Sequence, residues 1–159
     1  MKTDPPDYVE FTADDLGAVL VPMSALGEDG NGWINFEPAI NVDDLPPPRT
    51  GLAALLSGRG PDVPLATWTP GTAKGGRPEP PTIGIQHGAG PGARARLEET
   101  GRGVPKGWVV LQDHSKRGLV VAVSPSVGHD EIVAWLLAAA KVLSTVPLDR
   151  EWRAAVYRT

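Results

Sequence analysis

The chain has 159 residues, a net charge of −4 and no cysteine, with 41% hydrophobic and 21% charged residues. A chain of this length and composition forms one domain with its own core, which excludes an intrinsically disordered protein. The missing cysteine excludes disulfides, thiolate metal ligands and cysteine nucleophiles.

The first half of the chain predicts mainly strands. Residues 8–12 alternate as a strand does, and residues 17–22 predict a second strand that completes a hairpin. A helix over residues 13–21, capped by Thr12, is the alternative for this segment. Residues 32–37 predict a further strand, and residues 52–56 predict a short apolar helix.

Two segments rich in proline and glycine, 38–50 and 71–81, interrupt this pattern. Three consecutive prolines at 46–48 predict a stiff extended connector. Residues 71–81 predict a mobile linker. The sequence thus predicts one compact domain over 1–159 with a β-rich half at 8–70, a linker at 71–81 and a second half at 82–159.

The second half predicts the element order βαββαβ. Strands are expected at 82–87, 108–112, 119–123 and 151–158, with a short helix between Pro91 and Gly101 and a long one that opens at His129. This order is that of the ferredoxin-like arrangement, a four-stranded antiparallel sheet with both helices on one face. The predicted class is therefore α+β with a ferredoxin-like carboxyl-terminal half.

The two halves also suggest an internal repeat. A hairpin, a helix, the triplet Val-Pro-Leu and a strand with tryptophan occur in the first half, at 8–70, and again in the second. The triplet lies at Val63–Leu65 and at Val146–Leu148. A duplicated ββαβ unit would explain these features, and chance similarity between apolar hairpins is the interpretation that the residues favour.

Three candidate catalytic side chains gather at one edge of the predicted sheet. His87 ends the first strand, and Asp113 and His114 end the second, so they should lie within ~10 Å of one another, near Asp149–Glu151 at the start of the last strand. Histidine titrates near neutrality, so acid–base catalysis is one interpretation and a metal site is another. The residues favour a third, structural one, in which His87 faces the helices with Ile83 and Ile85.

A glycine-rich loop precedes the first helix of this half. Gly88, Gly90 and Gly92 are followed by Arg94, in a pattern that formally matches a dinucleotide fingerprint. The hairpin after Asp113 leaves no room for the second crossover helix of that fold. The loop therefore predicts at most a site for one phosphate or carboxylate at a helix N-terminus, and a tight turn that requires glycine is the alternative.

The face of the sheet opposite the helices is the second candidate site. If Ile83, Ile85, Val109 and Leu111 face the helices, the opposite face is too apolar to stay uncovered. Either the first half of the chain or a second copy should cover it, with a ligand pocket or a filled core between them. The open face would hold Trp108, Val110, Gln112, Val120, Ala122, Arg153 and Tyr157, of which Trp108, Gln112, Arg153 and Tyr157 would line the pocket.

The distribution of charged, aromatic and apolar residues limits the classes of partner that the chain can bind. Residues 1–81 hold 12 acidic and 5 basic residues, whereas residues 82–159 hold 7 acidic and 10 basic ones, so the second half is the one suited to an anion. Strand 119–123 has no aromatic residue for base stacking, so no nucleic acid is expected. The longest apolar run, 132–140, is short of the ~20 residues of a membrane helix, and the first ten residues lack an apolar segment, so no secretory signal is expected. A cytoplasmic location with no membrane partner is expected, while the cofactor stays unassigned.

These observations favour a non-catalytic module over an enzyme. Its expected ligand is a small anionic or apolar molecule or a protein partner, bound through the open face or the glycine-rich loop by a monomer or homodimer. The alternatives are a small enzyme that uses His87, Asp113 and His114, and a structural subunit of an assembly.

Overall fold

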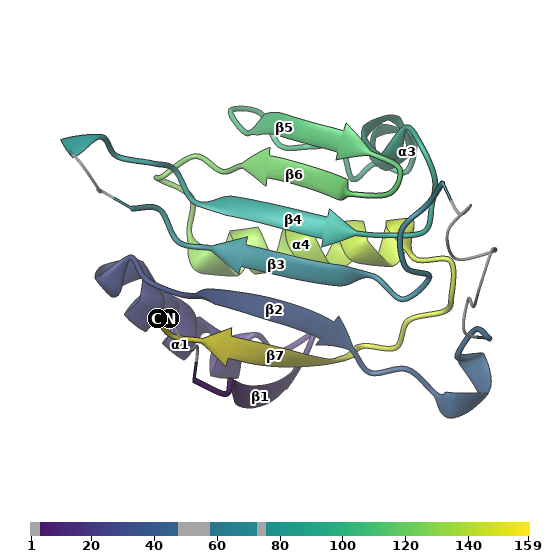
Figure 1. The fold of residues 1–159 in the computed structure, drawn as a ribbon, viewed down its shortest axis with the longest axis horizontal. Helices are drawn as coiled ribbons and strands as arrows, with labels where there is room; N and C mark the ends of the chain where they lie inside the picture. The colour runs from purple at the N-terminus through teal and green to yellow at the C-terminus, as the bar shows by residue number, and fades with distance from the viewer. Residues whose placement is uncertain (1–3, 48–57, 73–75) are drawn as a thin grey trace.

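The computed structural model describes residues 4–47, 58–72 and 76–159. Seven strands form one antiparallel sheet in the order β1-β7-β2-β3-β4-β6-β5, and the helices lie behind it (Figure 1). The predicted α+β class is confirmed. The strands are β1 (Asp7–Thr12), β2 (Trp33–Pro38), β3 (Leu65–Thr69), β4 (Thr82–Gln86), β5 (Val109–His114), β6 (Gly118–Ala122) and β7 (Glu151–Tyr157). The helices are α1 (Gly17–Asp29), α3 (Ala93–Glu99) and α4 (His129–Leu143), with a 3-10 turn, η1 (Val42–Asp44).

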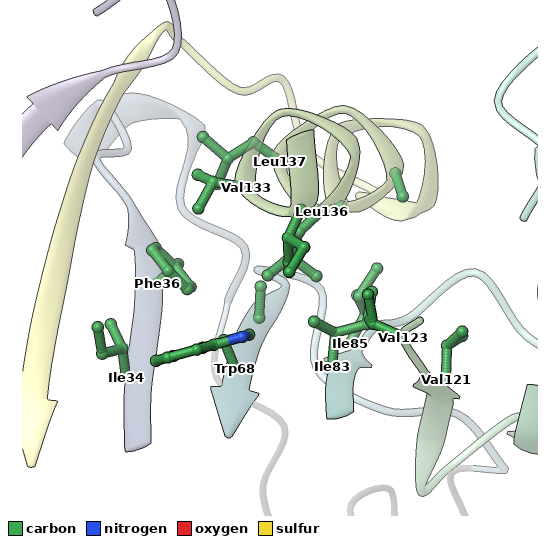
Figure 2. Close-up of a cluster of buried hydrophobic side chains, with 14 of the residues drawn as sticks. Ile34, Phe36, Trp68, Ile83, Ile85, Val121, Val123, Val133, Leu136 and Leu137 are labelled. Atoms are coloured by element: carbon green, nitrogen blue, oxygen red, sulfur yellow. The ribbon is translucent and has the colours of Figure 1, made fainter. Parts of the chain in front are cut away.

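One apolar core fills the space between the sheet and the helices. Helix α4 crosses the middle strands β3 and β4, with α1 beside β1 and α3 beside β5. Figure 2 shows Phe36, Trp68 and Ile85 rising from three strands toward Leu136 of α4. Every second residue of these strands therefore contacts the apolar face of α4. This arrangement follows from the two-residue repeat of a strand and the 3.6-residue repeat of a helix. Among the described residues, no helix has both the length and the apolar character that a membrane span requires.

The second half shows only part of a ferredoxin-like arrangement. β4 and β5 both pair antiparallel with β6, which lies between them. β7, however, pairs with β1 on one side and β2 on the other, so β2 and β3 separate it from β4. The expectation that the four strands of the second half form a sheet of their own is therefore wrong. Ala154, Ala155 and Val156 are all buried, which is typical of a strand in the middle of a sheet.

The strand expected at 17–22 is also wrong, because this segment belongs to α1. Its buried residues Val19, Met23 and Leu26 recur at helical spacing and continue past Pro22. The alternative prediction, a helix over residues 13–21, agrees better with the structure. The observed helix nevertheless begins at Gly17 and has no side-chain cap. Residues 8–22 therefore do not form the hairpin that was expected to match residues 108–123. The helix expected at 52–56 lies outside the described residues.

The first half of the chain does not cover the open face of the sheet, contrary to expectation. Its strands β1, β2 and β3 join the same sheet edge to edge. Phe11, Phe36 and Trp68 consequently enter the core, while Tyr8 and Trp33 lie on the opposite side. Residues 71–81 connect two paired strands, β3 and β4, with Thr72 opposite Glu79.

A β-bulge reverses the expected orientation of the first part of β5. The register shifts between Val110 and Gln112, so Leu111 is the extra residue. Trp108 is only 8% exposed and Val110 packs against the core, whereas Val109 and Leu111 are exposed. The predictions that Trp108 and Val110 face away from the helices, and that Val109 and Leu111 face toward them, are wrong. Beyond the bulge, Gln112 does lie on the open face, opposite Val120.

Candidate functional site

The open face, the side of the sheet away from the helices, carries small side chains in the middle and aromatic ones at the β1 end. One row crosses all seven strands, and its middle members are short, which leaves a flat surface. Within this row Thr67 Oγ1 donates a 2.9 Å hydrogen bond to Asn35 Oδ1. The row consists of Tyr8, Ala155, Asn35, Thr67, Gly84, Val120 and Gln112.

Arg153 is the centre of the aromatic end. The register places Glu10 of β1 and Glu37 of β2 on either side of it. Arg153 donates from Nη2 to Glu37 Oε2 at 2.6 Å and from Nε at 3.3 Å, and its Cζ lies 4.4 Å from the centre of the Tyr8 ring. The hydrogen bond to Glu37 raises the pKa of Arg153 above its usual value. The guanidinium is therefore charged and already paired.

A hollow of about 590 Å³ opens above this cluster, a volume within the range of ligand sites. Glu10, Glu37 and Glu151 line it with Arg153, so its charged side chains sum to −2. Arg153 already binds Glu37. The remaining carboxylates of Glu10 and Glu151 give the hollow a preference for a cation, not for the small anion expected from the sequence.

Two further aromatic residues extend the site along the sheet. The rings of Trp33 and Tyr157 stack with centroids 4.8 Å apart and planes 10° apart. Tyr8, at the outer edge, is 57% exposed. Flat aromatic faces next to carboxylates suit alkyl-ammonium or guanidinium groups.

The structure brings together only some of the ligand-binding residues predicted from the sequence. Arg153 and Tyr157 share the open face near the hollow. Gln112 lies on the same face, but four strands separate its own strand β5 from β7. Its Nε2 donates to the carbonyl oxygens of Arg117 and Gly118 at 3.3 and 3.2 Å. It therefore closes the β5–β6 hairpin. Trp108 lies on the other side of the sheet.

Sequence reasoning did not assign Tyr8, Glu10 and Glu37 to this site. A signal existed, because Tyr8 and Glu10 alternate along β1 as Trp33 and Glu37 do along β2. Alternation shows that such residues share a face. It does not show that β1 and β2 flank β7, and only that pairing brings them to Arg153.

The structure brings two of the three candidate catalytic residues, His87 and Asp113, near each other on the helix side and leaves His114 at the turn between β5 and β6. His87 follows β4 and is fully buried on the helix side, where Asp113 is near enough to affect its pKa. His114 pairs with Gly118, and its Nδ1 accepts hydrogen bonds from the backbone N–H groups of Lys116 and Arg117, both at 3.0 Å. Residues 149–151 lie with β7 instead, where Arg150 forms a 3.7 Å ion pair with Asp14.

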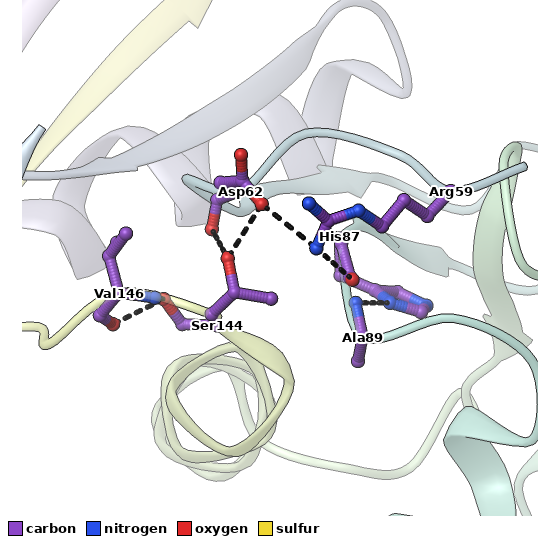
Figure 3. A network of polar contacts seen from close by, with 8 residues as sticks. Arg59, Asp62, His87, Ala89, Ser144 and Val146 are labelled. Atoms are coloured by element: carbon purple, nitrogen blue, oxygen red, sulfur yellow. Dashed lines mark hydrogen bonds and ion pairs between the residues drawn. The ribbon is translucent and has the colours of Figure 1, made fainter. Parts of the chain in front are cut away.

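A loop at residues 58–62, not singled out from the sequence, packs over His87 (Figure 3). A Cβ added to Gly60 would lie 2.4 Å from the His87 carbonyl oxygen, so only glycine permits this approach. Arg59 donates to the Gly88 carbonyl at 3.4 Å and pairs with Asp62, which in turn accepts a 2.8 Å hydrogen bond from Thr145. The loop thus ties the end of β4 to the end of α4.

The buried imidazole of His87 bonds to the backbone of the loop that follows it. Its Nδ1 accepts a 3.2 Å hydrogen bond from the backbone N–H of Ala89, and its Nε2 is buried without a partner among the described residues. Burial lowers the pKa of His87; Asp113 opposes this effect and Arg96 reinforces it. The neutral form is the native one.

Stability should therefore fall as the pH drops below about 6.5. The unfolded chain then binds a proton at this histidine that the folded protein rejects, with a slope of up to about 1.4 kcal/mol per pH unit until the lowered pKa is reached. Urea unfolding between pH 7.5 and 5.5 measures this slope. His87→Asn retains an acceptor for Ala89 and does not titrate, so it should flatten the slope. An unchanged slope in the variant would assign the acid sensitivity to other groups.

A carboxylate from β5 already occupies the helix N-terminus after the glycine-rich loop. The Asp113 carboxylate accepts a 3.2 Å hydrogen bond from the backbone N–H of Arg94 at the start of α3. The Arg94 side chain lies 3.7 Å from Glu98. Gly90 and Gly92 have positive φ angles, and a Cβ on Gly88 would lie 3.0 Å from the Pro61 carbonyl. Turn geometry and close packing account for these glycines.

A second hollow of about 680 Å³ lies between the end of α1, the arm that joins β3 and β4, and the start of α4. Trp68 and His129 line it together with several prolines, and their rings meet edge to face at 5.4 Å. None of the residues predicted from the sequence lines this hollow. Within the described ranges, no three His, Asp or Glu side chains converge as metal ligands.

Comparison with protein families, with curated proteins and with solved structures gave no match.

Proposed function

We propose that this protein is a non-catalytic binding module, and that the β1 end of its open face receives a basic segment of a partner protein. The observation that carries this proposal is the hollow above Arg153, where Glu10 and Glu151 remain after Glu37 has paired with the guanidinium. Lysine or arginine side chains satisfy both the carboxylates and the exposed ring of Tyr8.

The shape of the face supports a macromolecular partner. The short side chains of Asn35 and Thr67, both half-buried, lie beside the hollow, and no helix or strand of the described chain covers this face of the sheet. An extended segment fits the β1 end of such a face. Burial of His87 beneath residues 58–62 argues against the acid–base alternative, since substrate has no direct access to the imidazole.

Titration with a short basic peptide tests the proposal. The probe is a blocked six-residue peptide of alternating lysine and threonine, followed by amide chemical shifts of the protein. We expect shifts at β1, β7 and β2, with affinity that falls as salt rises. A peptide with glutamate in place of lysine should not bind. No binding of the lysine peptide at millimolar concentration, or shifts confined to the helix side, would refute the proposal.

Neutralising Glu10 and Glu151 should weaken this binding. Each exposed ion pair contributes at most about 1 kcal/mol, so Glu10→Gln with Glu151→Gln should raise the Kd roughly tenfold. The matched control is Glu99→Gln with Glu131→Gln, which removes the same charge from exposed positions on α3 and α4. The control should change the Kd less than twofold. Equal effects of the two double variants would show that net charge, not this site, attracts the peptide.

A further inference from the structure

The two edges of the sheet differ in ways that bear on how a partner segment binds. β5 forms one edge and is interrupted by the bulge at Leu111. β1 forms the other edge and pairs with β7 over six consecutive residues without a register shift. Bulges protect an edge from pairing with another strand, and a regular edge lacks this protection.

The backbone groups that β1 presents outward follow from its hydrogen bonding. The N–H of Ala13, just beyond β1, donates to the Arg150 carbonyl at 2.8 Å, so Ala13 points its backbone toward β7. Orientation alternates along a strand, so Phe11, Val9 and Asp7 also point inward. The N–H and C=O groups of Tyr8 and Glu10 therefore point away from the sheet. No backbone hydrogen bond outside the regular elements of the described chain uses them.

The charges beside this edge select the partner. Arg150 and Arg158 pair with Asp14 and Asp7, but Glu10 on β1, Glu151 opposite Thr12 and Asp15 after the strand add further carboxylates, so the outer edge is acidic. A second copy of β1 would bring like charges together, which opposes self-pairing. A basic strand would place a cation next to Glu10 at cross-strand distance, about 5 Å.

We infer that the partner segment binds by adding an eighth strand to β1. This inference rests on the proposed function and specifies its geometry: main-chain hydrogen bonds to Tyr8 and Glu10 provide the pairing, and alternate basic side chains lie over the open face. The exposed ring of Tyr8 contacts the aliphatic part of those side chains.

Backbone-methylated peptides distinguish strand addition from binding by side chains alone. Two isomers of the lysine–threonine peptide carry N-methyl groups either on all lysine amides or on all threonine amides. Only one set of amides faces β1 in an added strand, so one isomer should bind like the parent and the other should lose at least tenfold in affinity. Equal affinities, or equal losses, would refute strand addition. Binding of the parent peptide would then still support the proposed function, whereas failure of the parent would refute both.

Amide hydrogen exchange provides an independent readout on the protein. In the free protein, the outward amides of Tyr8 and Glu10 should exchange fast, and those of Val9 and Phe11 slowly. The parent peptide at saturation should slow exchange at Tyr8 and Glu10 by at least about tenfold. The outward amides of β5 serve as the internal control and should not change. Protection at β5, or none at Tyr8 and Glu10 while the peptide is bound, would place the segment elsewhere.

Discussion

Gly32→Ala is expected to destabilise the protein by about 3 kcal/mol or more. Gly32 has a φ of +88°, a conformation that costs an L-residue about 1–2 kcal/mol. A Cβ at this position would also lie 2.1 Å from the carbonyl oxygen of Tyr157, a backbone atom that cannot move without disturbing the β2–β7 ladder. Urea unfolding of the variant measures the loss.

Gly107→Ala is the matched control for this substitution. Gly107 has a φ of +89°, and a Cβ there would meet no atom within 4 Å. Gly107→Ala therefore has only the cost of the left-handed backbone conformation. The difference in unfolding free energy between the two variants gives the contribution of the close approach to Tyr157. Because Trp33 and Tyr157 stack directly beside Gly32, the Gly32 variant should also show altered tryptophan fluorescence. Equal losses in the two variants would mean that β2 and β7 do not meet as closely as described.

Local signals in the sequence were sufficient to locate most helices and strands. They were not sufficient to predict which strands pair with each other in the sheet. The acids at the start of α4 and the spacing of its apolar residues locate that helix, and alternation locates β1, β2 and β4. Nothing local links residues 7–12 to residues 151–157, because that pairing joins segments more than 130 residues apart in the chain. The three consecutive apolar residues at 154–156 were the one local indication that β7 is an interior strand.

The segment 17–22 shows how a short window misleads. Val19, Leu20 and Val21 favour a strand by residue type, and Pro22 favours an end. The helical spacing becomes visible only when Met23 and Leu26 are included. Burial of Val19 and Met23 against the core then outweighs the weak intrinsic preferences and retains Pro22 within the helix.

The candidate site depended on the same long-range pairing. Arg153 and Tyr157 were recognised because their own strand alternates, so residue type and parity were enough. The register of β7 with β1 and β2 was required to assign three further residues to the site, namely Tyr8, Glu10 and Glu37. His87 was correctly expected on the helix side because it shares parity with Ile83 and Ile85.

The second large loss of stability follows from the β-bulge in β5, which reverses which residues of that segment face the helices. Trp108→Ala should cost about 3–5 kcal/mol, because the ring is buried and meets Trp135 edge to face at 5.4 Å. Trp135 is itself fixed by a 3.2 Å hydrogen bond from its Nε1 to the Gly103 carbonyl, so a cavity at Trp108 cannot close easily. Chemical denaturation gives the value, and Trp108→Phe, with a smaller loss, serves if the alanine variant does not fold.

The neighbouring residue is the control that makes this test decisive. Val109 is 58% exposed on the open face, so Val109→Ala should change stability by less than about 0.5 kcal/mol. In a regular strand with Val109 and Leu111 facing the helices, the order of the two effects would be the opposite. A large loss for Val109 with a small one for Trp108 would therefore remove the bulge at Leu111, and with it the reason that β1 rather than β5 is the edge open to a partner strand.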